Sequence, residues 1–156
     1  MKKLKQSLGM VDVGYKPRTR REAAASATIH LGKKAFNLFM KEGSPKGNVL
    51  ETARVAAIMA AKATPQIIPM CHPLELNKVN ITFEIDKKNF MITVVALVNY
   101  DGRTGVEMEA LTAVAAGALT IYDMMKWADK GMTIENIQLL QKSGGKSDFE
   151  LCPKNI

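Results

Sequence analysis

The chain has 156 residues, of which 47% are hydrophobic, so it is long enough to fold as one domain that buries roughly 70% of the surface its unfolded form exposes. Its two cysteines and two histidines have no zinc-ligand spacing, and no apolar stretch is long enough for a signal peptide or a membrane span, so we expect a cytoplasmic protein with reduced thiols. The net charge of +7 favours an anionic partner, either nucleic acid or a phosphorylated small molecule.

The N-terminal part predicts a basic segment, a strand and a short helix. Residues 1–9 are expected to be flexible, and the first 21 residues contain seven basic side chains and a single acid. EAAASATIHL at 22–31 weakly favours a strand, and GKKAFNLFMKEG after it favours a short helix that Gly43 closes. The loop SPKG follows and carries Lys46.

A longer helix and a loop rich in proline come next. Asn48 is a good N-cap residue for the Ala-rich run VLETARVAAIMAAKA, and Thr64 and Pro65 are expected to end that helix. The following run, PQIIPMCHPLE, predicts a loop.

Two strands then form a predicted hairpin. KVNITFEID alternates apolar and polar residues, DKKN is the turn, and FMITVVALVNY returns as the partner strand. Both faces of the second strand are largely apolar, since Met91, Val95 and Leu97 lie opposite another apolar row. We therefore expect another subunit to cover part of the sheet.

The last elements are a long helix and a final strand. The helix is expected from near Gly105 through EALTAVAAGALTIYDMM, with Gly131 closing it, and TIENIQLLQ predicts the strand. KSGGKSDFE is expected to be a polar tail. The order strand, helices, strand, strand, helix, strand predicts an α+β, ferredoxin-like antiparallel sheet packed by helices, as one domain over residues 10–149 with a tail over 150–156.

Asp123 and Lys126 stand out at the end of the apolar helix. Their spacing of three residues places both on one helix face, within reach of each other. One interpretation is a surface ion pair, and the other is a proton-transfer pair at a site. Glu109 lies on the same polar stripe but about 21 Å from Asp123, so a site using both needs a long ligand or two subunits.

Cationic and titratable side chains also gather in short Gly/Pro loops, which is how anion sites are often built. These residues are Lys46, His72, Arg103, Lys142 and Lys146. GGKS ends like a P-loop, but the first glycine of that motif would fall on Leu140, and no helix follows. We therefore exclude a P-loop nucleotide site.

Three runs together resemble the molybdenum cofactor biosynthesis protein C family, the cyclic pyranopterin monophosphate synthases. They are KGNVLETARVAAIMAAKATPQIIPMCHPL, GRTGVEMEALTAVAAGALTIYDMMK and LLQKSGGKS, and the resemblance extends over about residues 10 to 149. It implies a lyase that converts 3′,8-cyclo-7,8-dihydroguanosine 5′-triphosphate to cyclic pyranopterin monophosphate and diphosphate. It also implies a homohexamer, a trimer of dimers, with sites at subunit boundaries.

The resemblance also implies the roles of individual residues. The catalytic positions fall on Asp123, Lys126 and Lys46. The substrate-binding positions fall on Met70, Cys71, His72, Met108 and Glu109, with Arg21, Lys142 and Lys146 matching further basic positions. No cofactor or protein-bound metal is expected, although Mg²⁺ could arrive with the triphosphate.

Some positions depart from the family pattern, and the basic composition leaves one alternative function to consider. Trp127 stands where the family commonly has a small residue, and Asn48 and Met125 also differ. An RNA-binding module on the same fold would suit a basic chain, but FMITVVALVNY lacks the aromatic pattern of such modules. We therefore expect a small-molecule substrate and neither nucleic acid nor a membrane as partner.

Overall fold

The computed structural model describes residues 9–152, so most of the predicted basic segment and the last four residues of the predicted tail lie outside the described residues. The described chain forms one α+β domain with a five-stranded antiparallel sheet. The strands are β1 (Thr19–His30), β2 (Lys78–Asp86), β3 (Met91–Gly102), β4 (Thr133–Ser143) and β5 (Phe149–Glu150). The helices are α1 (Gly32–Lys41), α2 (Val49–Lys62), α3 (Thr64–Ile67) and α4 (Glu107–Met125).

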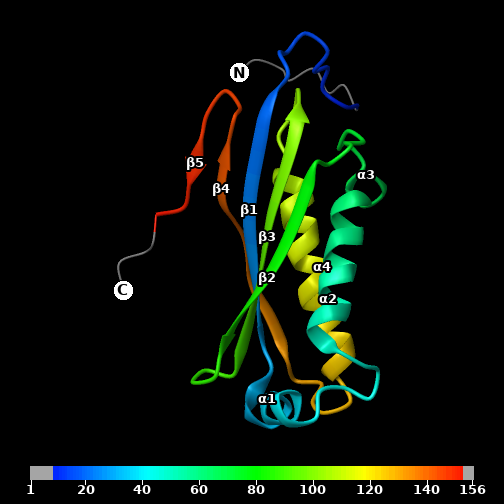
Figure 1. The fold of residues 1–156 in the computed structure, drawn as a ribbon, viewed down its shortest axis with the longest axis vertical. Helices are drawn as coiled ribbons and strands as arrows, with labels where there is room; N and C mark the ends of the chain where they lie inside the picture. The colour runs from blue at the N-terminus through cyan, green and yellow to red at the C-terminus, as the bar shows by residue number, and fades with distance from the viewer. Residues whose placement is uncertain (1–8, 153–156) are drawn as a thin grey trace, which may run out of the picture.

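The sheet has the strand order β2-β3-β1-β4-β5. Strand β1 lies in the middle and pairs antiparallel with both β3 and β4. The two long helices, α2 and α4, lie side by side along one face of the sheet, while α1 lies at one end of the molecule and α3 at the other (Figure 1). The α+β class, the antiparallel sheet and the order of the long elements are confirmed.

Several boundaries differ from those predicted. Strand β1 begins at Thr19, three residues before the predicted start at Glu22, because this stretch pairs with the end of β3 up to Gly102. The helix α4 ends at Met125, well before Gly131. The short helix α3, which begins with Pro65 in its first turn, replaces the first part of the predicted proline-rich loop.

The predicted polar tail KSGGKSDFE was wrong at both of its ends, which are strands. Strand β4 continues to Ser143, and β5 returns beside it, so that Lys142 lies opposite Phe149. This edge hairpin is largely exposed on both sides. Its sequence therefore lacks the apolar alternation that reveals a strand with one buried face.

Small residues let α4 lie close against the sheet. Ala23, Ala25 and Ala27 of β1 are fully buried on the helix-covered face. In the middle of α4, a Cβ atom on Gly117 would lie 3.0 Å from Val94 Cγ1 of β3. Strand β1 is accordingly rich in alanine rather than in β-branched residues, which explains why its sequence signal is weak.

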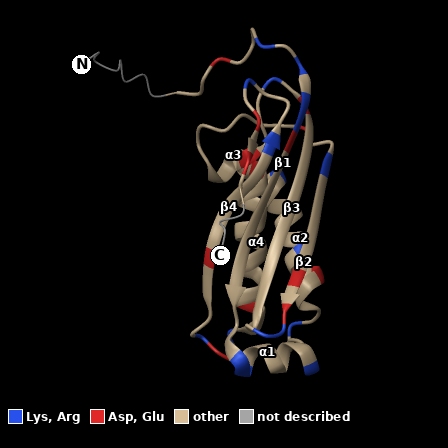
Figure 2. Cartoon of the chain, turned by 90° about the vertical axis from the view of Figure 1, so that its left-hand side faces the viewer, with Lys and Arg blue, Asp and Glu red and all other residues tan. Residues whose placement is uncertain are grey.

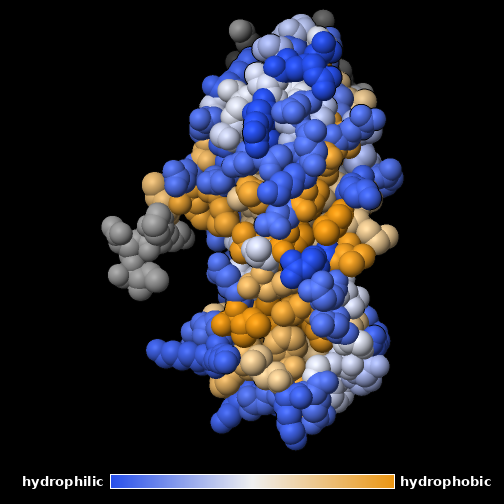
Figure 3. Space-filling model, viewed as in Figure 1, coloured by the Kyte–Doolittle hydropathy of each residue, from blue (hydrophilic) through white to orange (hydrophobic). Residues whose placement is uncertain are grey.

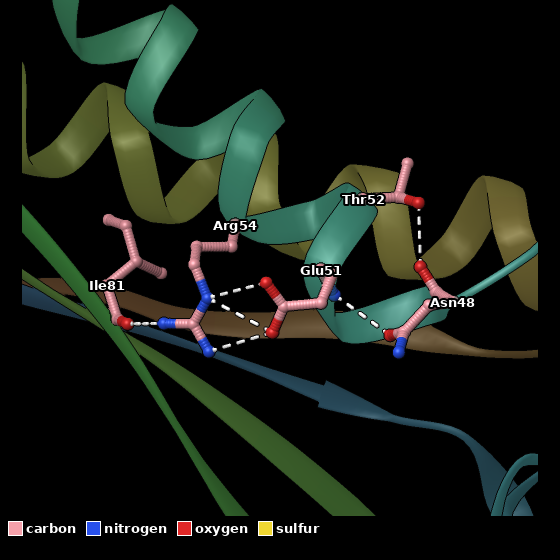
Figure 4. A network of polar contacts seen from close by, with 5 residues as sticks. All are labelled: Asn48, Glu51, Thr52, Arg54 and Ile81. Carbon is pink, nitrogen blue, oxygen red and sulfur yellow. Dashed lines mark hydrogen bonds and ion pairs between the residues drawn. The ribbon is translucent and has the colours of Figure 1, made fainter.

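Helix α2 is anchored at its start, as Figure 4 shows. The side chain of Asn48 accepts a hydrogen bond from the Glu51 backbone N–H at 3.0 Å, which confirms the predicted N-cap. One turn later, Arg54 pairs with Glu51 at 3.3 Å and donates a hydrogen bond to the Ile81 carbonyl of β2. These contacts fix the beginning of α2, and with it the end of the preceding loop, against the sheet.

The sheet face opposite the helices is partly apolar. Met91, Val95 and Leu97 of β3 are only half-buried there, and Figure 3 shows apolar surface across the middle of the molecule. Its coverage by another subunit stays a prediction. None of the helices between residues 9 and 152 has the length and apolar character needed to cross a membrane.

Candidate active site

The predicted site residues form two groups at opposite ends of α4. One group surrounds the beginning of the helix at Glu107, and the other surrounds its end near Met125. At 1.5 Å per residue, the 19-residue helix separates its two ends by about 28 Å. Figure 2 shows that lysines and arginines gather mainly toward the two ends of the elongated molecule.

At the end of α4, Lys46, Asp123 and Lys126 form an ion triplet that we call the lysine–aspartate cluster. Lys46 Nζ lies 2.7 Å from Asp123 Oδ2, and Lys126 Nζ lies 2.8 Å from Asp123 Oδ1. Each carboxylate oxygen therefore accepts one ammonium hydrogen bond. The predicted contact between Asp123 and Lys126 is confirmed, and Lys46 joins them from 77 residues away in sequence.

The loop that carries Lys46 is tied to α4 by a serine that sequence analysis missed. The Ser44 hydroxyl donates to the Met124 carbonyl at 2.7 Å and accepts from the Lys46 backbone N–H at 3.2 Å. It thus joins the backbone of Lys46 to the residue next to Asp123. A serine between Gly43 and Pro45 gives no local sequence signal for this long-range contact.

The charges of the cluster stabilise one another. Hydrogen bonds from Lys126 first, and from Lys46 second, lower the pKa of the Asp123 carboxyl to about 2. The same contact with Asp123 raises the pKa of Lys126. At neutral pH the resting cluster therefore holds an ionised carboxylate and a protonated Lys126.

A cavity of about 280 Å³ lies beside this cluster. It is lined by Pro45, Lys46, Asp123, Lys126, Trp127 and Lys130. All three predicted catalytic residues therefore border one space that is open to a ligand.

At the other end of α4 lies a second cavity of about 410 Å³, which we call the cationic cavity. Arg21, Lys142 and Lys146, the three predicted basic residues, all line it. Arg103, which the sequence analysis placed among the cationic loop residues, lines it as well. Lys16, Thr19 and Glu107 also line it, although they were not predicted as site residues. Glu107 had a signal, since it stands in GVEMEA beside Met108 and Glu109, whereas Lys16 and Thr19 had none.

The cationic cavity is built on a buried arginine and a tight glycine turn. Arg21 is only 8% exposed, and its Nε donates to the Gly102 carbonyl at 3.3 Å. Gly144 has φ of +84°, and a Cβ there would collide with the Arg20 carbonyl. The loop 144–148 consequently packs against the start of β1, where Thr19 Oγ1 donates to the Gly144 carbonyl at 2.6 Å.

The remaining predicted residues line a third cavity of about 300 Å³, which we call the side pocket. They are Met70, Cys71, His72, Met108 and Glu109. The side pocket adjoins the cationic cavity, since Thr104, Gly105 and Glu107 line both. Each predicted binding residue thus lies at the beginning of α4, and none lies at the lysine–aspartate cluster of the same chain.

Burial raises the pKa of the Glu109 carboxyl group. Its side chain is 3% exposed, and desolvation, with a smaller contribution from the charge of Glu107, raises its pKa to about 7. Burial also raises the pKa of the Cys71 thiol, with a further contribution from Glu109. The side pocket therefore contains a carboxyl group that can exchange a proton near neutral pH.

The buried Glu109 predicts a pH-dependent stability. Because its folded-state pKa of about 7 exceeds the ordinary value of 4.5, the free energy of unfolding falls as pH rises between these two values, by up to about 3 kcal/mol. Glu109→Gln is therefore expected to unfold at higher urea concentration than wild type at pH 8, with the difference vanishing near pH 4.5. The exposed substitution Glu84→Gln is the control, and an equal effect of both substitutions at pH 8 would contradict the assignment.

Residues 9–152 contain no group of three His, Cys, Asp or Glu side chains that could hold a metal ion.

Comparisons with known proteins show which family the chain belongs to. The model of the MoaC family matches residues 10–145. A cyclic pyranopterin monophosphate synthase of Listeria monocytogenes is 53% identical over 138 residues, which cover 88% of this chain and 86% of the relative. The synthase of Parvibaculum lavamentivorans is 51% identical with the same two coverages, and that of Thermomicrobium roseum is 50% identical over 88% of this chain and 83% of the relative.

One solved structure, the full extracellular region of zebrafish Gpr126/Adgrg6, matches with a TM-score of only 0.33 and 10% identity over 82% of this chain and 15% of that chain. The family model covers the whole of α4. The chain belongs to the MoaC family.

Proposed function

We propose that this protein is a lyase of molybdenum cofactor biosynthesis that converts the cyclised GTP derivative, 3′,8-cyclo-7,8-dihydroguanosine 5′-triphosphate, to cyclic pyranopterin monophosphate and diphosphate. The relatives that are about half identical over most of their length have this synthase name. The observation that carries the proposal at residue level is the contact of Lys46, Asp123 and Lys126 at 2.7 and 2.8 Å beside an open cavity.

The cationic cavity binds the triphosphate in this proposal. Four cationic side chains surround one space, which suits a polyanion such as a triphosphate. They are Arg21, Arg103, Lys142 and Lys146. Lys142 already has an ionic partner, Glu107 at 3.0 Å. Binding of the triphosphate would exchange this carboxylate for phosphate oxygens.

The lysine–aspartate cluster acts on the sugar and ring part of the substrate. A sugar hydroxyl attacks the α-phosphorus, the new O–P bond forms as the bond to the β-phosphate oxygen breaks, and diphosphate leaves with its charge balanced by lysines. Because Asp123 has a pKa of about 2, it begins ionised and serves as a proton acceptor or as an anchor for the two ammonium groups. Lys126, whose pKa is raised, begins as a proton donor.

We further propose that the site is shared between subunits of a homohexamer. Glu109 and Asp123 lie about 21 Å apart along α4, so one substrate cannot contact both ends of the same helix closely. A second copy that brings its cationic cavity to the lysine–aspartate cluster would complete the site. The half-buried Met91, Val95 and Leu97 offer apolar surface for such contacts.

Two further proposals concern the cofactor requirement of the reaction and the cellular location of the protein. The reaction needs no protein-bound cofactor, and Mg²⁺ enters, if at all, as part of the triphosphate substrate. The cytoplasmic location remains a prediction from composition.

Turnover of the cyclised GTP derivative tests the function directly. The purified protein is expected to release diphosphate and form cyclic pyranopterin monophosphate in equal amounts, measured by coupled diphosphate detection and by mass spectrometry. GTP is the control substrate and should release no diphosphate, since it lacks the additional bond between sugar C3′ and base C8 that the cyclised derivative has. A folded, assembled protein that releases no diphosphate from the cyclised derivative would refute the proposal.

A further inference from the structure

Trp127 is the only tryptophan of the chain, and it lies beside the lysine–aspartate cluster. Trp127 is 46% exposed, so nearly half of this large apolar residue is accessible to solvent and to a ligand. It lines the same cavity of about 280 Å³ as Lys46, Asp123 and Lys126. An exposed indole next to two cations and a carboxylate has the composition of a ligand site rather than of ordinary surface.

The turn that carries Trp127 is held in place on both sides. Immediately after α4, the Ala128 backbone N–H donates to the Met125 carbonyl at 2.9 Å. A few residues later, the Tyr122 hydroxyl of α4 donates to the Lys130 carbonyl at 2.8 Å. The backbone around the indole is therefore tied to the rigid helix that also carries Asp123, so little ordering is needed when a ligand arrives.

We propose that the Trp127 indole stacks on the fused-ring base of the nucleotide-derived substrate and sets its affinity. The inference rests on the proposed function, because that function supplies a guanine-derived base, whose six-membered ring keeps a π-face, at one end of the substrate and a triphosphate at the other. Aromatic side chains stack on nucleobases irrespective of base identity, since every base has a π-face. The lysine–aspartate cluster then acts on the ring and sugar that Trp127 holds, while the phosphates extend toward cations elsewhere.

The geometry separates this role from catalysis. Indole carries no group that accepts or transfers the protons of the reaction, so Trp127 is a specificity-determining residue and not an acid or base. Its effect should therefore appear in KM and not in kcat. The competing explanation for the exposed indole is that a neighbouring subunit covers it, which would show as blue-shifted emission and as loss of oligomers on substitution.

Paired substitutions test the stacking by kinetics. Trp127→Leu keeps an apolar side chain without a π-face and is expected to raise KM for the cyclised GTP derivative roughly tenfold, with kcat changed by less than about twofold. Trp127→Phe keeps a π-face and is expected to recover most of the affinity. Equal KM values for wild type and Trp127→Leu would overturn the inference, and so would an equal loss in the Phe and Leu variants.

Fluorescence of the single tryptophan gives a readout that does not depend on turnover. GTP, which carries a purine ring, is expected to quench the emission in a saturable way, whereas inorganic triphosphate at the same concentration leaves it nearly unchanged. Equal quenching by both ligands would assign the effect to phosphate near the lysines and overturn the stacking. Absence of any change with GTP would overturn it as well.

The two measurements distinguish failure of the inference from failure of the proposed function. If wild type turns over no substrate but GTP quenches Trp127 and triphosphate does not, the function fails and base stacking stands. If wild type is active and Trp127→Leu has normal KM, the function stands and the inference fails. A blue-shifted emission in the free protein, together with loss of oligomers in Trp127→Leu, would show instead that a second copy covers the indole.

Discussion

Asp123→Asn is expected to lower the rate of cyclic pyranopterin monophosphate formation by roughly a hundredfold or more while the fold and the assembly remain intact. The amide keeps the shape of the side chain but can neither accept a proton nor balance the charges of Lys46 and Lys126. In the wild type these two lysines contact the two carboxylate oxygens of Asp123 at 2.7 and 2.8 Å. Because the side chain of Asp123 is 49% exposed, the free energy of unfolding should change little.

A matched ion pair on another helix provides the control for this substitution. Glu51 and Arg54 of α2 are also three residues apart and lie 3.3 Å from each other, but neither lines the cavity beside the lysine–aspartate cluster, the cationic cavity or the side pocket. Glu51→Gln should therefore leave turnover within about twofold of wild type. If Asp123→Asn proteins of native mass also turn over at nearly the wild-type rate, Asp123 and Lys126 are an ordinary surface pair.

Mixed oligomers are expected to regain activity only for certain pairs of inactive variants. In a site that combines the lysine–aspartate cluster of one subunit with the cationic cavity of another, mixing Asp123→Asn with Lys142→Ala leaves some sites with both halves intact. Random exchange of subunits should restore about a quarter of the wild-type rate. Asp123 and Lys142 suit this test because they belong to opposite ends of α4.

A second mixture of variants, chosen from a contact within one chain, is the negative control for this experiment. Lys46 Nζ touches Asp123 Oδ2, so Lys46→Ala and Asp123→Asn damage the same half of the site. Mixtures of these two variants should stay inactive after verified subunit exchange. Light scattering of wild type must show a mass well above the 17.1 kDa of one chain, and an active monomer would rule out the shared site.

The sequence predicted the elements whose residues alternate or repeat clearly. The hairpin of β2 and β3 and the capped helix α2 follow from local patterns, because each has one buried face and recognisable ends. Strand β5 and the continuation of β4 could not be predicted in this way. Their pairing depends on a partner strand and not on burial, so neighbouring residues give no alternation.

For the candidate site, local spacing predicted less than the resemblance did. The i,i+3 spacing was enough to place Asp123 next to Lys126, but nothing in the loop SPKG indicated that Lys46 would reach them. Ser44 and Trp127 were not predicted as parts of the site at all, because their positions depend on how the loop and the turn fold against α4. The separation of the two residue groups along one helix was foreseen from the rise per residue alone.

The close approach of Gly117 to Val94 has a consequence for both groups. In the middle of α4, a Cβ atom on this glycine would lie 3.0 Å from Val94 Cγ1, so an added methyl group fits only if Val94 or the helix moves by a few tenths of an ångström. Where the helix moves, the shift reaches the lysine–aspartate cluster and the cationic cavity together, because they border its two ends. A substitution that contacts neither group would then change both.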